Sequence, residues 1–121
     1  MINPRETWLK TAANIICEEL LDSAAKLPRP EYRVSLTQSP SKPNAKTQVM
    51  GTCWNKAASA DNHYEIFITA TYGANDSIEI LETLMHELIH AYDNLENGHS
   101  GRFAAICKAA GILPTETKTA K

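Results

Sequence analysis

Apolar residues near the N-terminus recur with the spacing of an amphipathic helix. From Trp8 to Ala24 they fall every three or four positions, which places them on one buried stripe. Pro4 suits the first turn of such a helix, and two further prolines follow its end. We therefore expect an N-terminal helix, with Trp8 and Cys17 in the protein core.

Three short segments in the middle of the chain alternate between apolar and polar residues, as strands do. They are Tyr32–Leu36, Val49–Trp54 and Tyr64–Thr69, and a polar loop at 38–48 separates the first two. Their short connections predict an antiparallel meander. Gly51 inside the second strand indicates a bulge or a close approach of another part of the chain.

Two more helices are expected after the strands. Asp76 can cap the first, whose buried side carries large apolar residues from Ile78 to Tyr92. Ser100 can cap the second, and Gly111 marks its end. The pattern therefore predicts an α+β fold: an N-terminal helix, a small three-stranded antiparallel sheet, a central helix and a C-terminal helix.

The composition fits one intracellular domain. The chain has 121 residues, of which 43% are hydrophobic, and a net charge of −2. We expect a single domain over 1–121 with a flexible tail at 115–121. The three cysteines (Cys17, Cys53 and Cys107) form no C-x-x-C pair, which favours reduced thiols and a cytoplasmic location. No leader peptide or membrane-spanning stretch is expected, and the charge gives no general attraction to nucleic acid.

The candidate chemistry lies in the central helix, where the sequence reads His86-Glu-x-x-His90. Residues four apart lie on the same face of a helix, so both imidazoles can reach one metal ion. Glu87 lies beside them, where it can act as general base toward a metal-bound water. Three protein ligands and one open position are typical of a catalytic zinc (Zn²⁺) site.

The motif leaves the third ligand open among three downstream residues. His99 is the first choice, because Gly98 before it can turn the chain back toward the metal. Glu96 is the second choice. Asp93 suits either an outer role, in which it orients a ligand imidazole, or a solvated position at the helix end.

At these residues the chain resembles the SprT-like metalloprotease family. That family carries H-E-x-x-H-A followed by G-H-G-x-x-F, and this chain has His-Glu-Leu-Ile-His-Ala at 86–91 and Gly-His-Ser-Gly-Arg-Phe at 98–103. Gly51-x-Cys53 and the strand after it are similar to the strand pair that precedes the family's motif helix. The resemblance covers about residues 20–113, and Ser100 replaces the family's usual glycine.

The resemblance implies a compact zincin-like domain that binds zinc through His86, His90 and His99 and uses Glu87 as general base. Many members carry a zinc ribbon after this domain, for which the chain has no C-x-x-C. The expected partner is a protein or peptide substrate. Some members of the family degrade proteins crosslinked to DNA, so DNA association and a nucleoid location are further expectations. A basic rim for DNA could be formed by Lys42, Lys46, Lys56, Arg102 and Lys108. The oligomeric state is left open.

Two other functions are compatible with the motif. The first is a regulatory peptidase that cleaves a repressor, and the second is a non-catalytic zinc-containing binding module. Glu87 argues against the second, because a structural zinc site needs no general base. In an active enzyme we expect Tyr64–Thr69 to offer a free sheet edge to an extended substrate, since it directly precedes the motif helix.

Overall fold

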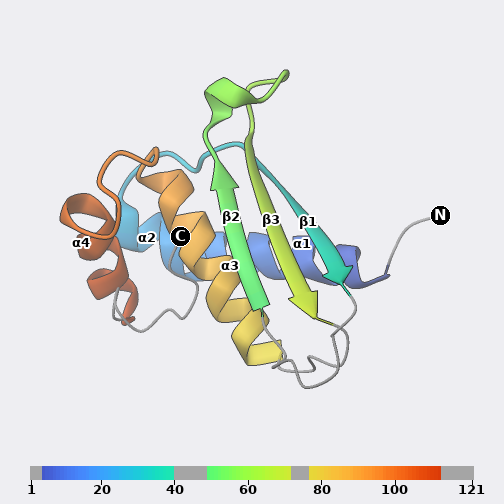
Figure 1. Ribbon diagram of the computed structural model, residues 1–121. Helices are drawn as coiled ribbons and strands as arrows, with labels where there is room; N and C mark the ends of the chain where they lie inside the picture. The colour runs from blue at the N-terminus through green and yellow to red at the C-terminus, as the bar shows by residue number, and fades with distance from the viewer. Residues whose placement is uncertain (1–3, 40–48, 72–76, 113–121) are drawn as a thin grey trace.

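The computed structural model describes residues 4–39, 49–71 and 77–112. It consists of one small sheet with helices packed behind it (Figure 1). The elements, in chain order, are α1 Pro4–Ile16, the π-helical turn η1 Cys17–Leu21, α2 Asp22–Ala25, β1 Tyr32–Ser39, β2 Val49–Trp54, the 3-10 turn η2 Lys56–Ala58, β3 Tyr64–Thr71, α3 Ser77–Tyr92 and α4 Gly101–Ala110. The α+β class predicted from the sequence is confirmed.

The sheet is mixed, with the strand order β1-β3-β2. β2 pairs antiparallel with β3, but β1 runs parallel to β3, with Tyr32 opposite Tyr64. The predicted antiparallel meander is therefore wrong. Alternation assigns side chains to the two faces of a strand but does not specify its neighbours. The nine-residue stretch 40–48 between β1 and β2 is long enough to pass two strand spacings, about 10 Å.

The position of β3 also corrects the expectation of a substrate edge at Tyr64–Thr69. β3 is hydrogen-bonded to β1 on one side and to β2 on the other. Its main-chain groups are already used by the sheet, so it cannot accept a further strand. Among the described strands, the free edges belong to β1 and β2.

The two faces of the sheet differ sharply. On the inner face, Val34, Ile66 and Ile68 are buried in one core with apolar residues of α1, α3 and α4. Figure 1 shows no helix over the outer face among the described residues, and large apolar side chains are exposed there. Met50 is 51% exposed and Trp54 is 55% exposed there. The described residues thus form two layers, a sheet and the helices behind it, and leave the outer face of the sheet uncovered.

The N-terminal helix contains a π-helical turn, η1, before it continues into α2. Its buried stripe includes Leu9, Ala13 and Cys17, which confirms the core position of Cys17. Trp8 is 42% exposed, so its expected core position is wrong. The apolar stripe is wider than the face that the sheet and α3 cover, and Trp8 lies on its rim.

The two C-terminal helices begin and end close to the expected residues. Gly111 caps α4 with φ 85°, in the left-handed region that favours glycine. Ser100 occupies the N-cap position of α4, but its hydroxyl donates to the Asn97 carbonyl at 3.0 Å instead of capping the helix. Ile78 is 68% exposed, which corrects its expected burial in the first turn of α3. The expected cap Asp76 lies outside the described residues.

The three cysteines are free thiols, as expected. Within 4–39, 49–71 and 77–112, no helix combines the length and the apolar character needed to cross a bilayer. The expected tail at 115–121 lies outside the described residues, and the extent of the domain over 1–121 stays a prediction.

Candidate metal centre

Two histidines on one face of α3 form the base of the site. His86 and His90 are one helical turn apart, and their Nε2 atoms approach to 3.1 Å. The side chain of His86 is fully buried and that of His90 is 5% exposed. The core contacts of Leu84, Leu88 and Ile89 hold this part of the helix in place and leave both imidazoles on the same side.

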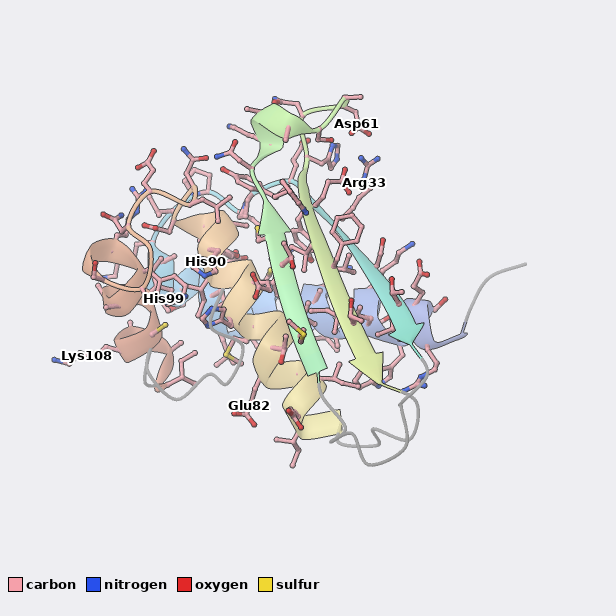
Figure 2. All side chains as sticks on the ribbon, viewed as in Figure 1. Arg33, Asp61, Glu82, His90, His99 and Lys108 are labelled. Atoms are coloured by element: carbon pink, nitrogen blue, oxygen red, sulfur yellow. The ribbon has the colours of Figure 1, made fainter. Side chains whose placement is uncertain are left out.

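The third histidine, His99, lies in the loop between α3 and α4. The Nε2 atom of His99 lies 3.1 Å from Nε2 of His86 and 3.2 Å from Nε2 of His90. The chain reverses direction after α3 through Asn94 and Leu95, whose φ angles are 55° and 58°, and Gly98 has φ 57°. In Figure 2, His90 and His99 lie close together on the side of β2 opposite β3. His99 is exposed, so the site opens to solvent on its side.

The three nitrogen atoms therefore form a nearly equilateral triangle, which fits a zinc ion. Three nitrogens, each about 2.0–2.1 Å from a tetrahedral ion, are about 3.3–3.4 Å from one another. The observed separations, 3.1–3.2 Å, are within a few tenths of an ångström of that geometry. Among the described residues, this is the one group of three His, Cys, Asp or Glu side chains close enough to share an ion.

The surroundings keep the buried imidazoles neutral, which is the form that binds metal. Burial lowers the pKa of His86 to about 3, and repulsion from His90 and His99 adds to the effect. Burial and the neighbouring His99 likewise lower the pKa of His90 to about 4. In the metal-free protein the two rings thus hold unprotonated nitrogens ready near neutral pH.

Phe103 on α4 packs against all three imidazoles. Its ring centroid lies 4.4 Å from that of His90 and 5.2 Å from those of His86 and His99. The Phe103 side chain is fully buried. It therefore restricts the orientation of each ring from the apolar side of the site.

Glu87 is the most unusual group in the site. Its side chain is fully buried, and both carboxylate oxygens lack a hydrogen-bond partner among the described residues. Burial raises its pKa to about 8. An unpaired buried carboxyl is costly, by roughly 1–3 kcal/mol or more, and is rare unless it serves a function.

Gly51 of β2 lies directly against this glutamate. A Cβ at position 51 would come within 2.8 Å of Glu87 Cγ and Oε2 and within 2.7 Å of Thr83 Cγ2. Real Cβ atoms do not approach other atoms so closely, so only glycine allows β2 to pack on α3 at this level. The sequence-based expectation of a close approach at Gly51 is confirmed.

Asp93 holds the loop that carries His99. Its carboxylate accepts hydrogen bonds from Asn97 N at 2.9 Å, Asn97 Nδ2 at 2.6 Å and Arg102 Nε at 3.0 Å. Arg102 also donates to the Asp93 carbonyl at 2.8 Å. These bonds hold the pKa of Asp93 below its usual value against the opposing effect of burial. Asp93, Asn97 and Arg102 are referred to below as the loop clamp.

The clamp corrects two expectations for the downstream acids. Asp93 is fully buried, not solvated, and it orients the loop instead of an imidazole. The Nδ1 atoms of His86 and His90 have no hydrogen-bond partner in the described part of the chain. Glu96 accepts from Asn94 at 2.8 Å and pairs with Arg102 at 3.0 Å, outside the group formed by the three histidines.

Sequence reasoning named the three histidines that the structure brings together, and Glu87 beside them, but not the residues that hold them in place. The contacts of Phe103 with the imidazoles and the role of Arg102 were not anticipated. A weak signal existed, because Asp93 and Arg102 flank the predicted turn and carry opposite charges. Their distance in space depends on the loop conformation, which spacing alone does not give.

Two imidazoles and a buried glutamate on one helix, with a third imidazole from the following loop, are typical of metallopeptidase-like domains. The SprT-like family model matches residues 17–120, and the chain belongs to the SprT-like family. The resemblance seen in the motifs is thereby confirmed. Comparisons with curated proteins and with solved structures gave no significant match.

Proposed function

We propose that this protein is a zinc-dependent metallopeptidase that hydrolyses peptide bonds in protein substrates. The observation that carries the proposal is the Glu87 carboxylate, which is buried and unpaired beside three convergent imidazoles. A site that only held a structural ion would have no use for such a group.

In this proposal His86, His90 and His99 would hold a zinc ion. Bound zinc supplies Lewis acidity, which activates a water molecule near neutral pH and polarises a carbonyl group. The histidines contribute by staying neutral and by keeping fixed positions against Phe103. The loop clamp keeps His99 over the two helix-borne rings.

Glu87 is the general base in the proposal. In the metal-free protein burial favours its protonated form. A cation among the three imidazoles favours the ionised form, so Glu87 becomes able to accept a proton when the site is loaded. It then takes the proton of the attacking water at one carboxylate oxygen and can return it to the leaving amine.

The substrate is proposed to bind along β2 instead of β3. β2 is an edge strand of the described sheet, and its inner face meets Glu87 at Gly51. An extended peptide can add to this edge through main-chain hydrogen bonds. Such binding uses main-chain groups of the substrate and would bring a peptide bond close to the glutamate and the three histidines.

The decisive experiment compares two glutamates of the same helix. Glu87→Gln should retain bound zinc but lose about 10²–10⁴-fold in the rate of cleavage of an unstructured protein, since the amide cannot accept the proton. Glu82→Gln, at an exposed position of α3, is the matched control and should cleave normally. Equal cleavage by both variants would remove Glu87 from the mechanism.

The same assay separates the alternative functions. A non-catalytic zinc-containing module would bind zinc with no hydrolysis by the wild-type protein, and a repressor-specific peptidase would spare unstructured proteins. DNA association stays an expectation from the family resemblance. Arg102, one of the five residues suggested for a basic rim, is already paired with Asp93 and Glu96.

A further inference from the structure

The outer face of β2 carries two large apolar side chains that the domain does not cover. Met50 and Trp54 are four residues apart on the same face of the strand and are 51% and 55% exposed. On the neighbouring strand, the side chains opposite them are Thr69 and Glu65, which leave both apolar groups accessible. We call Met50 and Trp54 the outer-face pair.

The outer-face pair has a defined position relative to the metal centre. The inner side of β2 meets Thr83 and Glu87 at Gly51, and Asn55 Nδ2 donates to the Asn94 carbonyl at 3.4 Å. β2 therefore runs alongside α3 in the same direction, from the level of Thr83 to the level of Asn94. Met50 thus directly precedes the residue that meets Thr83 and Glu87, and Trp54 directly precedes the residue that meets Asn94.

A peptide strand added to β2 would present alternate side chains to the two faces of the sheet. Side chains directly opposite each other on adjacent antiparallel strands have Cβ atoms about 4.5–5.5 Å apart, close enough for aromatic and aliphatic groups to pack. The substrate residues opposite Trp54 and Met50 would consequently contact those side chains. The residues between them would point toward Gly51 and Glu87 or would face solvent.

We infer that the outer-face pair selects substrates with two large apolar residues spaced four apart in an extended segment. This inference rests on the proposed function and assigns its substrate class. Large apolar residues are mostly buried in folded proteins. The class is therefore unfolded or locally unfolded protein, and Trp54 contributes more to selection than Met50 because its side chain is larger.

The test separates binding from cleavage. Zinc-loaded Glu87→Gln protein is used to capture peptides from a library of random, unstructured decapeptides, and bound peptides are sequenced. We expect enrichment of aromatic and large aliphatic residues at two positions four apart. Adding Trp54→Ala should weaken binding of enriched peptides by up to about fivefold and remove one of the two preferences. Adding Met50→Ala should remove the other.

Trp8→Ala in the same Glu87→Gln background is the matched control, because Trp8 is an exposed tryptophan on α1, away from β2. It should leave both preferences intact. Equal effects of Trp54→Ala and Trp8→Ala, or enrichment without the four-residue spacing, would overturn the inference. Cleavage by the wild-type protein is measured separately with the enriched peptides. If peptides with the apolar spacing are captured but never cleaved, the binding surface is supported and the proposed hydrolysis is contradicted. If peptides are cleaved but show no apolar spacing, the hydrolysis is supported and the inference about the outer-face pair is contradicted.

Discussion

Two polar clusters follow each other along the chain, one on α3 around Glu87 and one just beyond the end of α3 around Asp93, and they differ in how their polar atoms are satisfied. In the first, His86 Nδ1, His90 Nδ1 and both Glu87 oxygens lack hydrogen-bond partners among the described residues. In the second, the equally buried Asp93 carboxylate accepts three hydrogen bonds from Asn97 and Arg102. The first cluster lies on α3, and the second joins the loop after α3 to Arg102 of α4.

The difference indicates what each cluster is for. A buried polar group without a partner destabilises the fold by roughly 1–3 kcal/mol, whereas a hydrogen bond to a charged group stabilises it by about 1.5–3 kcal/mol. The unpaired cluster is thus organised around groups that the chain does not supply. The paired cluster is complete in itself, and its effect on the metal centre passes through the position of His99.

The largest expected difference concerns metal affinity. His86→Ala, His90→Ala and His99→Ala should each weaken zinc binding by more than about 100-fold, since losing an outer partner alone costs 10–100-fold. Competition with a chromophoric chelator measures this. His63→Ala, which alters a histidine beside Asp61 and away from the site, should bind zinc normally. Full affinity in His99→Ala together with loss in Glu96→Ala would contradict the ligand set.

Breaking the paired cluster should have a smaller effect. Asp93→Asn places an amide N–H₂ opposite the donors of Asn97 and Arg102, so we expect about 10–100-fold weaker zinc binding. The metal-free variant should also lose about 1.5–3 kcal/mol of unfolding free energy. Chelator competition and chemical denaturation measure the two effects.

Glu96→Gln tests whether the clamp depends on the exposed carboxylate that pairs with Arg102 from outside it. The Glu96 side chain is 57% exposed, and exposed ion pairs contribute little. Both zinc affinity and stability should stay close to wild type. If Asp93→Asn behaved like Glu96→Gln, the clamp would have no part in positioning His99.

A moderate effect is expected on the pH dependence of the stability of the metal-free protein. The pKa of Glu87 is about 8 in the fold against 4.5 for an ordinary glutamate, so its unfavourable burial reduces stability as pH rises through this range. The pKa values of His86 and His90, about 3 and 4, lie below 6.5, so stability falls as pH drops below 6.5. Together they place maximum stability near pH 6.5.

The alkaline side of this profile isolates the unpaired glutamate. Between about pH 6.5 and 8 the wild-type protein should lose at most about 1.4 kcal/mol per pH unit, and Glu87→Gln should lose much less. Denaturant midpoints measured with a chelator present provide the comparison, with Glu82→Gln as control. An identical decline in both variants would show that another group titrates there.

The features predicted correctly from the sequence were those encoded by local spacing. The limits of β2 and the left-handed end of α4 at Gly111 follow from residues adjacent in the chain. The four-residue spacing of His86 and His90 equally implies one helical face, and the structure brings His99 to them. Their roles as ligands stay predictions for the experiments above.

The features that could not be predicted depend on distant parts of the chain. β1 pairs with β3, and the whole of β2 lies between these two strands in the sequence. The alternation of apolar and polar residues carries no information on such long-range pairing. The exposure of Trp8 depends on how much of a wide apolar stripe the sheet covers. The hydrogen-bond partners of Asp93 depend on the conformation of a loop in which Asn94 and Leu95 adopt left-handed backbone angles. Neither residue is a glycine, so the sequence did not indicate this conformation.

The mixed sheet also has a consequence for the order of folding. β2 and β3 are neighbours in the chain, and Trp54 pairs with Glu65 across a short connection. Tyr32 pairs with Tyr64 over a much longer sequence separation, which includes the whole of β2. Short loops close faster and at lower entropic cost than long ones, so the β2–β3 hairpin should form first and β1 should join it later. In pulse-labelled hydrogen exchange during refolding, amides shared by β2 and β3 should gain protection before those shared by β1 and β3. The edge of β2, which is proposed to bind unfolded chains, would then form before the rest of the protein has finished folding.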